Sequence, residues 1–124
     1  MNSVRRCVTL SIAALLACGS GSLFAQNWPT KPVRLVVTFA PGGSSDIVAR
    51  LIAGPLQDRL GQPVVVDNKP GAGATIGAAE VARAAPDGYT LMLSNSAPIS
   101  ISPFMLDQMT YDPVKGFTHV FYIG

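Results

Sequence analysis

The sequence has few charged side chains and almost no excess of either sign. Charged residues make up 13% of its 124 residues, and the formal net charge is +2 at pH 7. Two of the nine basic residues, Arg5 and Arg6, lie within the first 25 residues, so seven basic side chains face seven acidic ones from residue 26 onward. This balance argues against broad electrostatic binding of nucleic acid or of a membrane surface.

Thiols and imidazoles are equally scarce. The two cysteines, Cys7 and Cys18, also fall within the first 25 residues, and His119 is the one histidine of the sequence. From residue 26 onward no disulfide framework or cysteine metal cluster is available, and one histidine does not make a zinc site. We therefore predict a protein with neither a metal nor a cofactor.

No apolar run of the amino-terminal segment is long enough to span a bilayer. Residues 1–6 are short and basic, and residues 7–17 are apolar. This order is typical of a signal peptide. We predict cleavage after Ala25, export to the periplasm, and one domain over residues 26–124. A lipoprotein signal at residues 15–18 (LLAC), with Cys18 lipidated, is the less favoured alternative.

The sequence that follows alternates between strand-like and helix-like segments. Strands are predicted at 33–39, 64–66 and 89–93, separated by helices over 44–60 and 76–84; a short helix at 99–106, a turn at 111–113 and a final strand at 117–123 follow. Apolar, β-branched runs that alternate with helices indicate an α/β fold with a parallel sheet.

The first predicted helix carries several local signals. Ser44 or Ser45 is expected to cap its amino terminus, and Asp46 adds a favourable negative charge there. Pro55 predicts a kink or a restart, and Gly61 ends the helix. Apolar residues recur at helical spacing at Ile47, Val48, Leu51, Ile52, Leu56 and Leu60. The aromatic residues Tyr89, Phe104, Tyr111 and Phe121 are expected to lie in the core.

Two glycine-rich turns dominate the chain. Segment 39–46 (FAPGGSSD) and segment 68–77 (NKPGAGATIG) each end a predicted strand and open a predicted helix. Such turns expose unpaired N–H groups at the positive end of the helix dipole, where a carboxylate or phosphate is held. A third polar group, Ser94-Asn95-Ser96, ends the next strand. Because parallel strands end at one edge, the three segments predict an anion site there.

Other interpretations of these turns are weaker. A dinucleotide fingerprint needs a third glycine at position 76, where Ile76 stands, and neither turn carries the Gly-Lys-Ser/Thr of a nucleotide-binding loop. A nucleophilic serine lacks its usual glycine-flanked elbow, and His119 is distant. Taken singly, each turn is equally well explained as a tight, ligand-free connection. Two turns together with residues 94–96 favour a binding site.

Six segments resemble a known family in order and spacing. They are 28–34 (WPTKPVR), 39–46 (FAPGGSSD), 60–66 (LGQPVVV), 68–73 (NKPGAG), 85–90 (APDGYT) and 111–115 (YDPVK). Over nearly all of residues 27–124 the chain resembles the amino-terminal part of the periplasmic receptors of tripartite tricarboxylate transporters, the Bug family. The resemblance implies one lobe of a two-lobed clamshell, a type II periplasmic-binding-protein fold. Such a receptor is not an enzyme; it captures small di- and tricarboxylates and delivers them to membrane transporter subunits.

The resemblance also assigns roles to the three polar segments. One carboxylate of the ligand would be held by Gly43, Ser44, Ser45 and Asp46; the other end by Gly73, Ala74 and Thr75; and Ser94, Asn95 and Ser96 would line the cleft. Judged without the resemblance, Asp46 is better explained as a residue that stabilises the start of the helix than as a catalytic acid or base.

The length departs from the family pattern. The chain ends where the backbone of a family member would cross into the second lobe, so the resemblance implies a truncated receptor with half of its site. Two alternatives stay open on the sequence alone: a small α/β enzyme acting on a carboxylate or phosphate ester, and a nonfunctional fragment.

Overall fold

A three-stranded parallel sheet forms the centre of the protein. The computed structural model describes residues 28–123, and its strands are β1 (Val33–Val37), β2 (Val64–Asn68) and β3 (Thr90–Leu93). The strand order is β2-β1-β3, with β1 parallel to both neighbours. Four of the five residues of β1 are buried, as its near-continuous apolar sequence predicts for a central strand.

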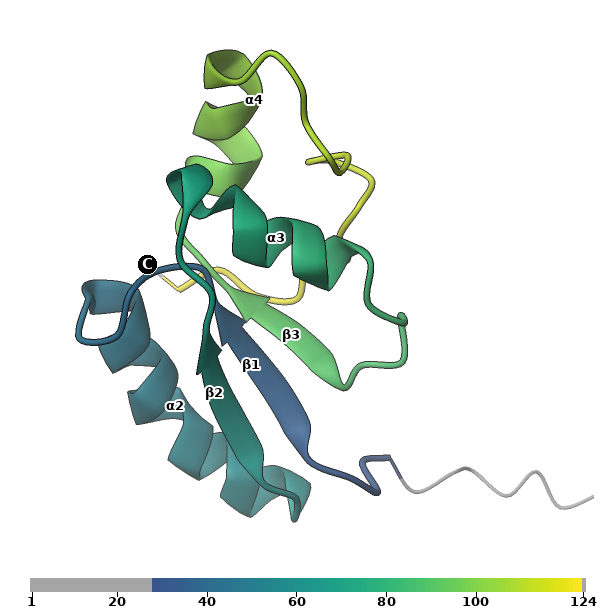
Figure 1. Ribbon diagram of the computed structural model, residues 1–124. Helices are drawn as coiled ribbons and strands as arrows, with labels where there is room; N and C mark the ends of the chain where they lie inside the picture. Colours follow the sequence, from purple (N-terminus) through teal and green to yellow (C-terminus); the bar gives the residue numbers. More distant parts are fainter. Residues whose placement is uncertain (1–27, 124) are drawn as a thin grey trace, which may run out of the picture.

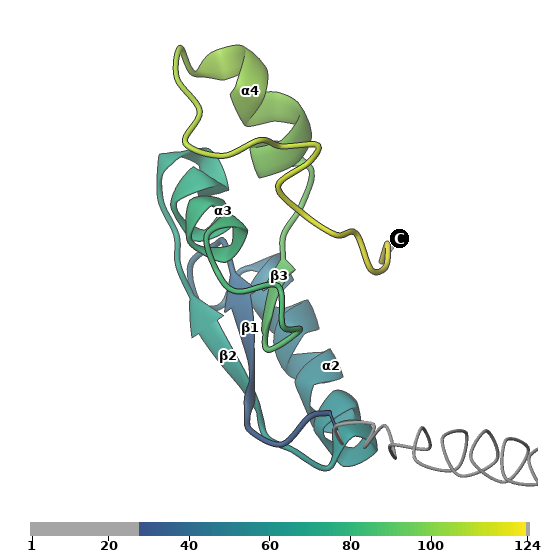
Figure 2. The same cartoon turned by 90° about the vertical axis from the view of Figure 1, so that its right-hand side faces the viewer.

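Two helices cover opposite faces of this sheet (Figures 1 and 2). Helix α2 (Ser44–Leu60) connects β1 to β2, and helix α3 (Thr75–Ala82) connects β2 to β3. On the α2 face Leu35 and Val37 pack with Ala49. On the other face Ala78 and Ala79 of α3 form a second cluster with Tyr111. The α/β fold with a parallel sheet, predicted from the alternating segments, is confirmed.

The chain then continues beyond the carboxyl ends of the strands. The wide-turned π-helical segment η2 (Ala97–Ile101) runs into the single-turn helix α4 (Ser102–Met105), which stands past the arrowheads of the sheet in Figure 1. Together they replace the single helix predicted at 99–106. A turn after Asp112 is held by its carboxylate, which accepts the N–H groups of Val114 and Lys115 at 2.9 Å each. Within residues 28–123 no helix has both the length and the apolarity needed to cross a membrane.

The start of α2 differs from the expectation of a serine cap. The capping residue is Gly43, and neither Ser44 nor Ser45 makes a side-chain cap hydrogen bond, because both lie inside the first turn. The carboxylate of Asp46, the third residue of the helix, instead reaches back and accepts the N–H of Gly42 at 2.8 Å. As in a capping box, an acidic side chain at the third helical position accepts a backbone N–H at the helix start, but here the donor lies one residue before the cap.

The sequence suggested a kink or a restart of helix α2 at Pro55. The structure shows no restart there. The helix runs as one element from Ser44 to Leu60 and ends at Gly61, whose φ of +66° is the left-handed conformation typical of a helix stop. Proline removes the hydrogen bond to the carbonyl four residues earlier, which belongs to Leu51. Leu51 is 70% exposed and Pro55 is exposed as well, so the position of the lost bond lies on the solvent side of the helix.

The predicted final strand at 117–123 is wrong. Residues 118–123 make no strand in the structure, and Figure 2 shows this stretch lying apart from the sheet. Val120, Phe121 and Tyr122 are 82–83% exposed. A strand needs the backbone hydrogen bonds of a neighbour, and among residues 28–123 no other strand pairs with this segment. Phe121 and the 89%-exposed Phe104 are therefore not core residues, whereas Tyr111 is.

Candidate functional site

The three polar segments meet at one edge of the sheet. Val37, the last residue of β1, is in register with Asn68 of β2 and with Leu93 of β3, so all three strands end at the same level. We call the connections that follow loop 1 (residues 38–43), loop 2 (residues 69–74) and loop 3 (residues 94–96). Loop 1 leads to α2 on one face, and loop 2 leads to α3 on the other. Such a divergence is where open α/β sheets bind ligands.

Loop 1 delivers the chain to the amino terminus of α2. Gly42 adopts a φ of +82°, a conformation that side-chain-bearing residues rarely take, and Gly43 is extended. The first N–H groups of a helix have no acceptor within the helix. In α2 these groups belong to Ser44, Ser45 and Asp46, and Ser44 is exposed. The 17-residue helix thus presents its positive end at the edge where the strands finish.

Asp46 is turned inward rather than toward a ligand. It is only 3% exposed. Besides the N–H of Gly42, its carboxylate accepts from Nε of Arg50 at 3.0 Å and from Nδ2 of Asn68 at 3.1 Å. The hydrogen bonds from Arg50 and from the Gly42 N–H lower the pKa of Asp46 from its ordinary 3.8 to about 2. The carboxylate of Asp46 fixes loop 1, and its charge is neutralised by Arg50. Asp46 could therefore contribute to an anion site only through its backbone N–H group.

The low pKa of Asp46 predicts a pH-dependent contribution to stability. Because the folded-state pKa of about 2 lies below the ordinary value of 3.8, the stabilisation is complete above 3.8 and is lost as the pH falls toward 2. Asp46→Asn should therefore lower the urea midpoint at neutral pH, and its difference from the wild type should shrink near pH 2. Asp58→Asn, at an exposed position of the same helix, is the control and should change the midpoint little. A constant Asp46→Asn difference across this range would contradict the prediction.

Loop 2 has an unusual backbone. Gly71, Ala72, Gly73 and Ala74 all have positive φ values, and the last three form the short 3-10 turn η1 (Ala72–Ala74). Ala72 has a φ of +45° and Ala74 a φ of +74°, which are rare conformations for a residue with a Cβ atom. Two hydroxyls stabilise the loop: Oγ1 of Thr75 donates to the carbonyl of Ala72 at 2.7 Å, and Oγ of Ser102 donates to the carbonyl of Gly73 at 3.1 Å.

Loop 3 is the shortest of the three. Oγ of Ser94 lies 2.6 Å from Oγ1 of Thr38, a fully buried residue at the end of β1. Oδ1 of Asn95 accepts the N–H of Ala97 at 2.8 Å, which leaves the amide nitrogen of this exposed side chain facing solvent. Ser96 is exposed as well. The side chains of Asn95 and Ser96 are thus exposed at this edge, whereas the hydroxyl of Ser94 is already bonded within the protein.

The sequence-predicted site residues therefore gather at one edge but differ in role. Ser44, Ser45, Asn95 and Ser96 present polar groups there, the hydroxyl of Thr75 is already bonded to the carbonyl of Ala72, and Gly43, Gly73 and Ala74 shape the backbone. The side chains of Asp46 and Ser94 hold the loops in place. Sequence reasoning missed the partners in this second role, which are Thr38, Arg50, Asn68 and Ser102. For Thr38, Asn68 and Ser102 the signal was a position at the end of a strand or the start of a helix, and for Arg50 it was the four-residue spacing from Asp46.

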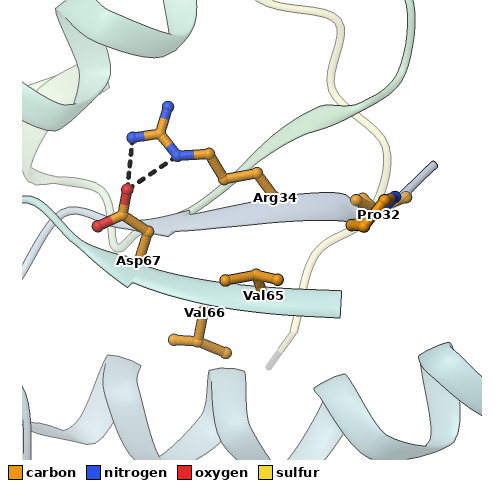
Figure 3. Close-up of a pocket in the computed structure, with 6 residues that line it drawn as sticks. Pro32, Arg34, Val65, Val66 and Asp67 are labelled. Atoms are coloured by element: carbon orange, nitrogen blue, oxygen red, sulfur yellow. Dashed lines mark hydrogen bonds and ion pairs between the residues drawn. The ribbon is translucent and has the colours of Figure 1, made fainter. Parts of the chain in front are cut away.

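A separate polar cluster lies away from the loops. Arg34 of β1 contacts Asp67, with Nε 2.8 Å from the carboxylate, and also pairs with Glu80 of α3. Hydrogen bonds to Glu80 and then to Asp67 raise the pKa of Arg34. Arg34 and Asp67 border an open pocket of about 370 Å³, together with Pro32 and Val65. Figure 3 shows these side chains and the contact between Arg34 and Asp67. Because both acids neutralise Arg34, this pocket offers little attraction to an anion.

The fold and the site together define a class of protein. A parallel α/β lobe that gathers glycine-rich, helix-opening loops at the point where its connections diverge has the architecture in which open α/β sheets bind small molecules. Residues 48–124 match the tripartite tricarboxylate transporter family receptor, TctC. The chain belongs to this receptor family.

Known relatives agree with this assignment. BugT of Bordetella pertussis is 39% identical over the whole of this chain, which spans 38% of the length of BugT. MatC of Rhodopseudomonas palustris, solved with bound malate, is 42% identical with a TM-score of 0.70 over 73% of this chain and 31% of its own. Rpa4515 of R. palustris, solved with adipate, is 41% identical with a TM-score of 0.67 over 69% of this chain and 29% of its own. The chain thus spans about a third of the length of these relatives.

Proposed function

We propose that this chain forms the amino-terminal lobe of an extracytoplasmic receptor that captures small di- or tricarboxylates for a tripartite tricarboxylate transporter. The observation that carries the proposal is the convergence of loops 1, 2 and 3 at one edge of the sheet, with the amino terminus of α2 among them. Malate in MatC and adipate in Rpa4515 support the choice of carboxylates. The signal peptide at 1–25 and its less favoured alternative, a lipid anchor at Cys18, fall outside the described residues; the signal peptide and periplasmic export stay predictions.

In this proposal loop 1 and loop 2 hold opposite ends of the ligand. The N–H groups of Ser44 and Ser45, with their hydroxyls, receive one carboxylate at the positive end of α2. Gly73, Ala74 and Thr75 receive the other end, and Asn95 and Ser96 border the space between. Backbone donors bind an anion without a buried cationic side chain, so release of the ligand does not require breaking a buried ion pair.

The same geometry supports binding rather than catalysis. The titratable side chain among the proposed site residues is Asp46, and its carboxylate is occupied by Gly42, Arg50 and Asn68. With a pKa of about 2 it stays ionised at neutral pH and is a poor proton donor or acceptor there. We therefore propose a receptor without enzymatic activity and with no cofactor or metal.

Exchange of Ser44 for proline tests whether the backbone of α2 binds the anion. Ser44 is the first residue of the helix, where proline is well tolerated, and the preceding Gly43 already has the extended conformation that proline requires (φ −75°, ψ 168°). Ser44→Pro removes the N–H donor, whereas Ser44→Ala removes only the hydroxyl. We expect Ser44→Pro to weaken malate or adipate binding about tenfold, the value of a hydrogen bond to a charged group.

The measurement is a titration of the isotope-labelled chain with malate and adipate, followed by amide NMR shifts. The largest shifts are expected at loops 1 and 2 and at the first turn of α2, and the neutral diamide of the same length is the control ligand. Ser44→Ala should retain more of the affinity than Ser44→Pro. Shifts confined to the Arg34 pocket, or equal binding of diamide and diacid, would contradict the proposed function.

A further inference from the structure

Asn68 joins the two loops that are proposed to hold the ligand. It is the last residue of β2, opposite Val37 of β1, and loop 2 begins at the next residue. Its Nδ2 donates to the carbonyl of Phe39 in loop 1 at 3.0 Å and to Oδ1 of Asp46 at 3.1 Å. A primary amide has two N–H donors, and here both are directed from the start of loop 2 to loop 1 and α2.

Beyond Asn68 the sheet no longer holds the two loops together. The last backbone hydrogen bond before the loops diverge runs from the N–H of Lys69, the first residue of loop 2, to the carbonyl of Val37, the last residue of β1, at 2.8 Å. After this bond the chain of loop 1 turns to α2 and that of loop 2 turns to α3, on opposite faces (Figure 1). The side chain of Asn68 thus spans a place where two diverging loops would otherwise be free to separate.

Two other single side-chain bonds hold the loops, one between loops 1 and 3 and one between loop 2 and α4. Thr38, at the end of β1, is bonded to Ser94 of loop 3, and Ser102 of α4 is bonded to Gly73 of loop 2. Each of these two bonds joins hydroxyl or carbonyl groups, whereas Asn68 also bonds a buried carboxylate that itself holds the N–H of Gly42. Asn68 therefore acts on both the position and the internal shape of loop 1.

We propose that Asn68 is a positioning residue that sets the separation of loop 1 and loop 2, and hence the length of dicarboxylate that the receptor accepts. This inference rests on the proposed function, since it assumes that the loops hold the two ends of one ligand. A rigid pair of anion sites favours the chain length that matches their spacing, and one methylene too many or too few costs roughly tenfold in affinity. Without Asn68 the loops would adapt to several lengths.

The variants follow from the chemistry of the amide. Asn68→Asp keeps the shape and the oxygen that accepts from Nη2 of Arg50 at 3.4 Å, but it replaces the donor nitrogen by an acceptor oxygen, so the bonds to the carbonyl of Phe39 and to the carboxylate of Asp46 are lost. Asn68→Ala removes the link without adding charge. Gln57→Ala, which removes an exposed amide from α2, is the control. Amide hydrogen exchange without ligand should quicken in loops 1 and 2 of both Asn68 variants and stay unchanged in Gln57→Ala.

The deciding experiment measures binding of succinate, glutarate and adipate to the wild-type chain and to Asn68→Ala by amide NMR titration. We expect the wild type to prefer one length by roughly tenfold over its neighbours, and Asn68→Ala to bind all three within about twofold of one another. If Asn68→Ala kept the wild-type preference for one diacid length, or if amide hydrogen exchange in both loops were unaltered, the proposed role of Asn68 would be overturned. The proposed function would not be affected by either result. Failure of the wild type to bind any of the three diacids would overturn the proposed function itself.

Discussion

Gly77→Ala should destabilise the protein by about 1–3 kcal/mol, although alanine is the better helix former. Gly77 lies buried in α3, and a Cβ atom there would stand 2.9 Å from the carbonyl oxygen of Lys69 and 3.1 Å from Cγ2 of Thr38. The first contact is with backbone, which cannot rotate away. Helix α3 would have to move off the sheet at the point where loop 2 begins, so we also expect weaker carboxylate binding.

The same exchange at Gly54 provides the matched control. Gly54 lies inside α2, and a Cβ atom at this position would have no neighbour within 4 Å. Gly54→Ala should therefore stabilise the protein by about 0.5–1 kcal/mol through the lower backbone entropy of the unfolded chain. Urea unfolding of both variants measures the difference. Equal effects of the two exchanges would show that α3 does not approach the sheet as closely as described.

Tyr111→Ala should cost about 3–5 kcal/mol, the usual loss for a buried aromatic side chain. Tyr111 is 9% exposed and packs with Ala78 and Ala79 of α3. Its ring meets Phe117 edge to face with centroids 5.5 Å apart, and its hydroxyl donates to the carbonyl of Pro98 at 2.6 Å. One side chain thus fixes the chain after α4 to the second face of the sheet.

A second tyrosine, nearer the carboxyl end of the sequence, supplies the control. Tyr122 is 83% exposed, so Tyr122→Ala should change the free energy of unfolding by no more than about 0.5 kcal/mol. Tyr111→Phe isolates the hydroxyl and should cost about 1 kcal/mol. If Tyr111→Ala unfolded with the same midpoint as Tyr122→Ala, the second cluster would not be part of the stable core.

The parts of the fold that the sequence predicts well are those with local causes. The apolar run of β1, the helical spacing of α2 and the stop at Gly61 depend on neighbouring residues only. The end of β2 was predicted two residues early, because aspartate and asparagine are uncommon in strands. Both side chains are nevertheless satisfied, Asp67 by Arg34 and Asn68 by loop 1, so pairing with β1 continues to its end.

The same distinction applies to the site. The glycine-rich turns could be recognised because their chemistry is contained in a few consecutive residues. The bonds that hold the loops together could not, since Thr38 and Ser94 are separated by 56 residues and Asn68 and Phe39 by 29. Likewise, segment 117–123 has the composition of a strand, but strand formation depends on a neighbour that no local pattern reveals.

The strand order also determines when the sheet can assemble. Strand β1 is the first to be synthesised yet occupies the middle of the sheet, and its second neighbour ends only at Leu93. During vectorial synthesis, Val33, Leu35, Val36 and Val37 therefore stay without their full cover until some sixty further residues have followed, a delay typical of parallel sheets. For that interval the apolar side chains of the central strand lack the neighbour that later covers them, so they are open to contact with other chains.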